Sequence, residues 1–311
     1  MKKLFVFAIA AVAMTVACQK NQDVNLGTEN EGDLVEIRLN SNLVTVETKG
    51  IESLEGQELF VYGRSDNNKR QVLNAPATVD AAGNMTLDKT YFYDPKGNYS
   101  FYGYCLHGAL ADGSVYDAPT ALTIDGSNDV LLAVAEGTFS AATARNDVHP
   151  HLVFAHVLSK FTFAVANVGN TDMTLSDITI DTPLAGTITL TGAQGVAAGT
   201  EEGNIDLAVS ATDLAAQTGA ADPTFTALDG VEALVFPAST YTLNVKLTQE
   251  GLDNTRVIPV TVTDDIVGGT QYTFNIKLYS LEKIEITASL KGWGDPVVLD
   301  YDTSDLEEVE E

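Results

Sequence analysis

Three closely spaced histidines are the residues best suited by type to form a metal site. His149 and His151 flank Pro150, and His156 follows five residues later. The proline holds the first pair in an extended conformation, where alternate residues share a face, and the spacing fits no helical His-x3-His site. We therefore expect strand histidines with ordinary hydrogen-bond partners and no metal ion.

Other residue types that could support catalysis stand in unfavourable contexts. The sequence has no glycine-rich phosphate loop after a strand, no Gly-x-Ser-x-Gly motif and no carboxylate pair marked by its neighbours. The pair Asp264-Asp265 precedes two glycines, which indicates a turn between strands, with Ca²⁺ binding as the alternative. Cys105 lies in the apolar run 101–106, which is typical of a buried, unreactive thiol. The sequence therefore predicts no enzyme and no cofactor.

Cys18 has the clearest chemical role. Two lysines follow the first methionine, an apolar run continues to Val16, and the small residue Ala17 precedes the cysteine. This pattern predicts a signal peptide over residues 1–17, whose apolar part is too short to span a bilayer. The site resembles the lipobox at which bacterial lipoproteins are cleaved and acylated, so we expect lipidation of Cys18. A plain signal peptide with an incidental cysteine is the alternative.

Charge and cysteine count limit the possible partners. The net charge of −26 argues against nucleic acid or an anionic membrane surface as a binding partner. Only Cys105 remains after Cys18, so the mature chain cannot form an intramolecular disulfide. Cohesion must come from packing.

The segment 18–49 predicts a tether followed by a separate strand. Residues 19–33 are polar with almost no apolar content, as in a solvated linker. Val35, Ile37 and Leu39 then alternate with polar residues, the period-2 pattern of a half-buried strand. A second β-branched stretch, 43–50, ends in Lys49 and Gly50.

From residue 58 onward the pattern is that of an all-β protein. Short runs rich in Val, Ile, Thr, Tyr and Phe recur between Gly, Asn, Asp and Pro turns, which indicates a sandwich or barrel. We expect a loop or short helix over 140–147 and a surface excursion over 192–203. The strong strand ending near Asn167 predicts a junction there, giving an N-terminal domain over 50–167 and a C-terminal domain over 168–294.

The C-terminus carries one more alternating pattern. A clear strand over 284–290 is interrupted by Gly292-Trp293-Gly294, and the alternation resumes with Val297, Leu299 and Tyr301. Six of the last ten residues are acidic, which is typical of a disordered tail.

Several of these segments together resemble the fimbrillin family, the subunits of type V pili. The matching pieces are the run 130–133, the run 151–163, Gly268-Gly269 with the strand to Ile276, and the strand 284–293, behind the lipobox. Each motif alone is a strand with typical flanks, and their order and spacing carry the specificity. The likeness covers nearly the whole chain.

The resemblance implies two transthyretin-like β-sandwich domains in an outer-membrane lipoprotein precursor. In that family a protease specific for arginine or lysine cuts shortly after the lipidated cysteine, and the mature subunit joins a fimbrium at the cell surface. Lys49 followed by Gly50 matches this site by position, although arginine is the commoner residue. Arg38 is the second candidate, but a cut there would leave part of the strand behind.

Removal of the leading strand suggests how copies would join. Once the strand of Val35, Ile37 and Leu39 leaves, its groove exposes apolar side chains and unpaired backbone groups. A trailing strand from another copy could pair with these backbone groups and fill the groove with Val297, Leu299 and Tyr301, which we call its plug residues. This predicts a homopolymer that mediates adhesion, with segment 295–311 as donor strand and tail. The alternative is that this strand is simply the last one of its own domain.

Two other functions remain open at this stage. A lipid-anchored surface protein that binds glycan would need exposed aromatic platforms, whereas the only tryptophan, Trp293, directly follows a core-like strand. A pilus anchor or tip protein would lack the N-terminal cut or a usable C-terminal strand.

Overall fold

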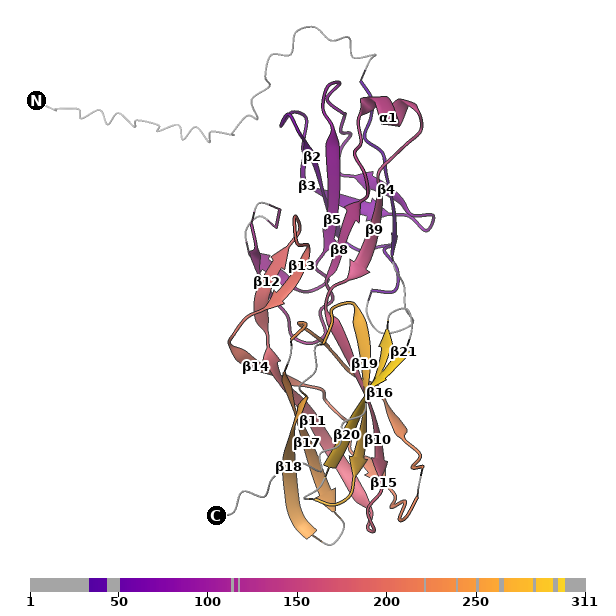
Figure 1. Cartoon of the computed structure of the whole chain (residues 1–311), viewed down its shortest axis with the longest axis vertical. Coiled ribbons are helices and arrows are strands. Elements are labelled where there is room, and N and C mark those ends of the chain that lie inside the picture. Colours follow the sequence, from indigo (N-terminus) through magenta and orange to yellow (C-terminus); the bar gives the residue numbers. More distant parts are fainter. Residues whose placement is uncertain are drawn as a thin grey trace, which may run out of the picture. The chain divides into compact units, whose positions relative to one another are not determined.

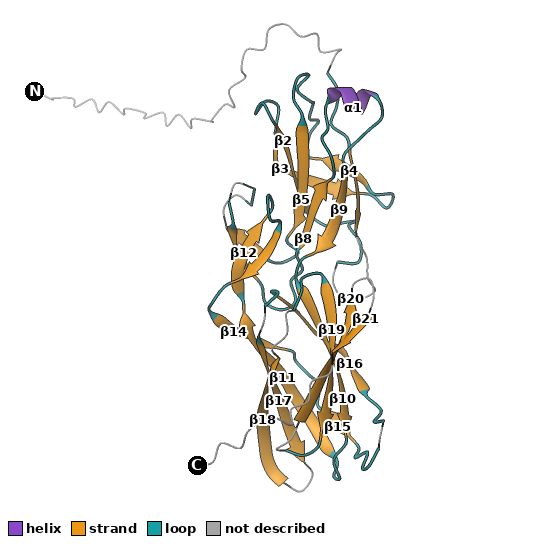
Figure 2. Cartoon of the chain, in the orientation of Figure 1, coloured by secondary structure: helices purple, strands orange, loops and turns teal. Residues whose placement is uncertain are grey.

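The computed structural model describes residues 34–43, 51–112, 115–116, 118–220, 222–238, 240–249, 252–262, 266–281, 284–292 and 296–299. Almost all regular structure in these ranges is β-strand (Figure 2). The all-β prediction is therefore confirmed. The predicted signal peptide, Cys18, Lys49, Gly50, Asp264, Asp265, Trp293 and Tyr301 lie outside the described residues.

The N-terminal strands close into a seven-stranded barrel, one of the two architectures that the strand pattern allowed, and not the sandwich that the family resemblance implied for this half. Its order is β1-β4-β3-β2-β5-β8-β9. The first strand closes the barrel because it pairs with both β4 and β9. The strands are β1 (Leu39–Leu43), β2 (Leu59–Ser65), β3 (Val72–Val79), β4 (Asn84–Leu87), β5 (Tyr99–Cys105), β8 (Leu131–Ala135) and β9 (His151–His156).

Aromatic and aliphatic side chains fill the interior of this barrel. Tyr99 and Phe101 of β5 are fully buried and stack with their ring centroids 5.9 Å apart. Alternate residues of each strand face inward, which is the reason the period-2 pattern was readable in the sequence.

The C-terminal strands form two sheets that pack face to face. One sheet has the order β16-β10-β19-β20-β21 and the other β14-β11-β17-β18, with β15 beside β11 (Figure 1). The first contains β10 (Ser159–Asn167), β16 (Thr226–Val235), β19 (Thr270–Leu278), β20 (Ile284–Gly292) and β21 (Pro296–Leu299). The second contains β11 (Met173–Pro183), β14 (Glu202–Asp206), β15 (Thr212–Leu214), β17 (Tyr241–Gln249) and β18 (Leu252–Val262).

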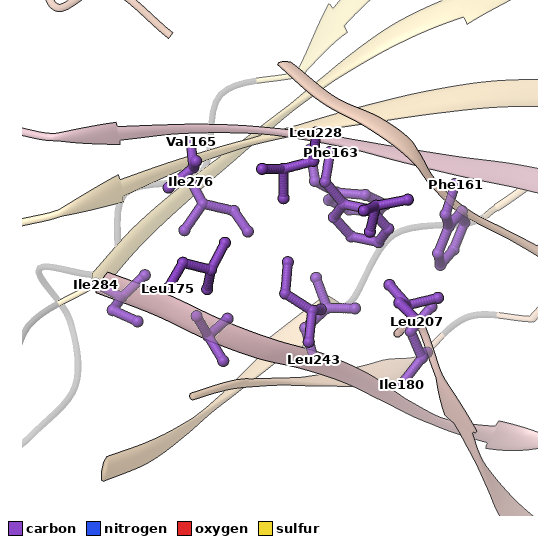
Figure 3. Packing of buried hydrophobic residues seen from close by; sticks show 14 of the residues in the cluster. Phe161, Phe163, Val165, Leu175, Ile180, Leu207, Leu228, Leu243, Ile276 and Ile284 are labelled. Atoms are coloured by element: carbon purple, nitrogen blue, oxygen red, sulfur yellow. The ribbon is translucent and has the colours of Figure 1, made fainter. Parts of the chain in front are cut away.

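The core between these sheets is apolar. Phe163 and Ile276 from one sheet and Leu175 and Leu243 from the other point into the shared space (Figure 3). Burial of such side chains stabilises a sandwich by about 1.5–3 kcal/mol each.

A small third sheet links the two halves of the chain. Its order is β13-β12-β7-β6, and β12 pairs antiparallel with β7. The strands are β6 (Leu110–Asp112), β7 (Thr120–Thr123), β12 (Ala185–Thr189) and β13 (Gly195–Ala198). A core cluster under this sheet contains Tyr104 and Leu122 from the first half and Ile188 and Phe236 from the second. The segment 192–203, expected to be a surface excursion, supplies β13.

Strand pairing places β10 with the C-terminal sheets. The expected junction at 167/168 follows this strand, whereas the sheets themselves change between His156 and Ser159. The division into two domains stays a prediction.

The described residues contain one helix, α1 (Ala141–Arg145), as expected between 140 and 147. Ser140 caps it, because its side chain accepts from the Thr143 N–H while the Thr143 hydroxyl accepts from the Ser140 N–H. In the part of the chain that the structure describes, no helix is long and apolar enough to cross a membrane.

Candidate functional site

The leading strand inserts its apolar face into the barrel core. Ile37 is 5% exposed and Leu39 2%, while Val35 and Leu43 pack against the same cluster. The alternation of Val35, Ile37 and Leu39 predicted this inward face, but β1 begins only at Leu39, and the residues before it are joined to the barrel by the bridge of Glu36 with Phe92. The next inward residue, Ser41, is also buried and donates its hydroxyl hydrogen to the carbonyl oxygen of Gly83.

The strand is held on one side by a continuous parallel ladder. Asn40 lies opposite His151, and the register runs on to Leu43 opposite Phe154. The N–H of Asn40 donates to the carbonyl of Pro150 at 3.0 Å. All other strand pairs of this barrel are antiparallel. The parallel neighbour is therefore specific to β1.

On its other side the segment 35–43 pairs in two stretches. Before β1, Glu36 forms a bridge with Phe92, and the N–H of Ile37 donates to the Tyr91 carbonyl at 2.8 Å. Within β1, Leu39 and Asn40 pair with Met85 and Asn84 of β4, and the N–H of Ser41 donates to the Gly83 carbonyl at 2.7 Å. A groove of about 360 Å³, lined by residues 36–40, 84–87, 89 and 90, lies where the register changes between these two stretches.

Gly83 permits the close approach at the end of the strand. Its φ is +84°, in the left-handed region that favours glycine, and a Cβ there would clash with the Ser41 carbonyl oxygen. The turn between β3 and β4 therefore requires glycine where it meets β1.

The space that the segment 35–43 fills between β9 and β4, called the slot below, is suited to bind an extended chain. An occupant must provide two or three apolar side chains at alternate positions and must pair with β9 and β4 through its backbone. Burial of Ile37 and Leu39 contributes about 3–6 kcal/mol, and each backbone hydrogen bond adds about 1 kcal/mol. Removing the occupant would leave two unpaired strand edges beside an open core.

The two candidate cleavage sites differ in what the structure describes. Arg38 points outward from the leading strand with 70% of its side chain exposed, and its Nε lies 3.1 Å from the Glu36 carboxylate. Lys49 lies in the segment 44–50, outside the described residues. Leu43 and Ile51 bound this segment, and both pack in or against the barrel core.

The candidate donor strand pairs within its own chain in this structure. β21 is the edge strand of its sheet and pairs antiparallel with β20 over four residues, with Val297 opposite Leu290 and Leu299 opposite Ala288. Its free edge carries no strand among the described residues. Its role as a donor stays a prediction.

The histidines have separate partners. The His149 ring lies 3.1 Å from Asp147, the His151 ring lies 2.8 Å from Asn42 of β1, and the His156 ring lies 2.9 Å from Asp129. Among the described residues no three metal-ligating side chains gather into a group.

The sequence analysis did not identify Asp129, the partner of His156, whose carboxylate is more deeply buried than that of Asp147, the partner of His149. Asp129 is 1% exposed and precedes the apolar run of β8. An acidic residue at the entry of a core strand was the available signal. Its contacts with Ile51 and His156 could be seen only in the folded chain.

Cys105 is buried, and burial raises the pKa of its thiol to about 11. The thiolate is the reactive form, so at pH 8 only about one thiol in a thousand is ionised. In a variant lacking residues 1–18, iodoacetamide at pH 8 should therefore leave Cys105 unmodified for hours, and 6 M guanidinium should make it react within minutes. Mass spectrometry measures the adduct, and rapid alkylation of the folded chain would contradict this expectation.

Comparison with known proteins agrees with this architecture. A family model described as fimbrillin-like matches residues 45–293. No curated protein matches the chain.

Two solved structures share the fold. Both are candidate cell adhesion proteins: one from Bacteroides uniformis has 16% identity and a TM-score of 0.52, covering 84% of this chain and 99% of its own. The other, from Bacteroides ovatus, has 14% identity and a TM-score of 0.53, covering 88% and 99%. The fimbrial anchor protein Mfa2 from Porphyromonas gingivalis also matches, with 9% identity and a TM-score of 0.39 over 86% and 100%. Because the family model spans most of the sequence, the chain belongs to the fimbrillin-like family.

Proposed function

We propose that this protein is a structural subunit of a type V pilus, exported as a lipoprotein and polymerised by strand exchange. In this proposal Cys18 is acylated, a protease cuts after Lys49, and the released strand is replaced by the C-terminal strand of another copy. The precursor belongs to the outer membrane and the mature form to a fimbrium on the cell surface. Its two halves correspond to transthyretin-like domains, for which the opposed C-terminal sheets provide support.

The observation that carries the proposal is the position of β1. Among the barrel strands that the structure describes, it alone precedes the predicted cut, and it closes the barrel between β4 and β9. A single cut after Lys49 would convert this strand from a covalent part of the chain into a bound peptide. Its pairing with β4 covers only Leu39 and Asn40, and so short a ladder supports its release.

The middle of the chain offers few residues that a protease specific for arginine or lysine could cut. Between Gly97 and Val245 the sequence contains two, Arg145 and Lys160. The side chain of Lys160 is 1% exposed and its Nζ lies 2.8 Å from a Glu232 carboxylate oxygen. Between Gly97 and Val245, Arg145 is therefore the one exposed basic residue that such a protease could cut in the folded chain.

The exposed surface does not favour glycan binding as a second function. Among the described residues, the large hydrophobic side chains that are well exposed are all aliphatic: Leu73, Leu110, Val134, Val148, Val153 and Val267. A sugar ring usually stacks on an exposed aromatic face.

N-terminal sequencing of the protein taken from the cell surface tests the proposal. We expect Gly50 as the first residue, in material that migrates as a polymer. Acylated Cys18 on a monomeric protein would contradict it and would favour a lipid-anchored or anchor-type role.

A further inference from the structure

The side chain of Asp129 holds the start of the chain that would remain after cleavage. Its Oδ2 accepts a hydrogen bond from the backbone N–H of Ile51 at 3.0 Å, and its Oδ1 accepts from the N–H of Val130 at 2.8 Å. The same Oδ2 lies 2.9 Å from Nδ1 of His156, the last residue of β9. Three groups thus satisfy one buried carboxylate.

This arrangement keeps the carboxylate charged inside the protein. Burial by itself raises the pKa of Asp129, but the hydrogen bond and charge of His156 and the N–H groups of Ile51 and Val130 outweigh it, so the pKa lies below its ordinary value of 3.8. A charged acceptor binds a backbone N–H more strongly than a neutral one does. The Ile51 N–H therefore has a strong and specific partner.

Ile51 lies at the end of the barrel where β1, which would leave after the cut, ends and the rest of the chain begins. β1 runs parallel to β9 from His151 toward His156, and Leu43 is opposite Phe154. Ile51 is bound to the Asp129–His156 pair at that same end of β9. Ile51 and Leu54 are buried in the same core cluster as the inward residues of β1.

We propose that the Asp129–His156 pair anchors the new N-terminal segment, so that residues from Ile51 onward stay in place when β1 leaves. The proposal rests on the proposed function, because only the cut after Lys49 turns Ile51 into a near-terminal residue. Chain termini fray unless they are tied to the fold. A loosened segment could also enter the vacated slot itself, where its covalent attachment gives it an effective concentration in the millimolar range, ahead of any strand from another copy.

Hydrogen exchange of single backbone amides tests the anchor in the uncut protein. In Asp129→Asn we expect the Ile51 amide to exchange at least tenfold faster than in the wild type, with no change at buried amides of β5. Asp147→Asn is the matched control, because it neutralises an Asp–His pair whose carboxylate is 99% exposed. Equal exchange of Ile51 in the wild type and Asp129→Asn would overturn the proposal.

If Asp129→Asn does not fold, hydrogen exchange of the wild-type protein alone tests the anchor. After a lysine-specific protease has cut the chain and β1 has been washed out, the Ile51 amide should still exchange at least tenfold more slowly than the amides of its exposed neighbours Glu52 and Ser53. Loss of that protection would overturn the anchor.

Failure of the pilus function gives a different result. A cut wild-type chain that keeps Ile51 protected but never polymerises would contradict strand exchange and leave the anchor intact. Where the wild type polymerises, we expect cut Asp129→Asn to polymerise at least tenfold more slowly.

Discussion

Lys49→Gln should abolish polymerisation, leaving a monomer that still carries its leading strand. The physical reason is the covalent link between β1 and the barrel. A short linker holds a segment at an effective concentration in the millimolar range, whereas a strand from another copy competes at micromolar concentration. This difference of about 1,000-fold, or about 4 kcal/mol, favours the chain's own strand until the link is cut. Gel filtration after exposure to a lysine- and arginine-specific protease measures the outcome.

Lys49→Arg is the matched control, because it keeps a basic residue at the site, and it should polymerise like the wild type. Arg38→Gln should also polymerise, because it changes an exposed side chain whose partner, Glu36, lies two residues earlier in the same segment before β1. If Arg38→Gln blocks assembly while Lys49→Gln does not, the cut falls at Arg38 and the assignment of Lys49 is wrong.

Truncation after Pro296 should give a protein that is cut normally but does not polymerise. It removes Val297, Leu299 and Tyr301, the proposed plug residues for the slot left by Ile37 and Leu39. Burial of three such side chains would supply about 5–8 kcal/mol before the cost of ordering the strand. To be donated, the strand must leave β20, with which it pairs along one edge over four residues. Because the slot offers pairing on two edges, we expect the exchange to be favourable.

Truncation after Tyr301 is the control for this experiment. It removes the acidic tail but keeps all three plug residues, so polymerisation should be retained, and with less charge repulsion between copies it should be less sensitive to low salt. A chain truncated after Pro296 that still forms polymers once β1 is gone would show that the C-terminal strand is not the donor.

Period-2 alternation made much of the fold predictable. The alternation of Val35, Ile37 and Leu39 identified side chains that face the core, although β1 itself runs from Leu39 to Leu43, and the same pattern identified β19 and β20. The short helix after Ser140 could also be predicted as one of two possibilities, because a capping residue acts over a few neighbouring positions. The segment 192–203 was harder, because its small residues lack the β-branched pattern, and β13 forms there by pairing with β12.

The sequence by itself determined the all-β class, many of the strands with their apolar faces, and the position of Lys49 between the first strand and the rest. Only the tertiary structure decided that this strand lies parallel to β9 and closes a barrel, and that Asp129 and His156 meet at Ile51, across 78 and 27 positions of sequence. Strand patterns are local, since each residue's burial depends on its own side chain. Pairing partners and buried hydrogen-bonded pairs depend on which distant segments the packing brings together, and no local pattern records that choice.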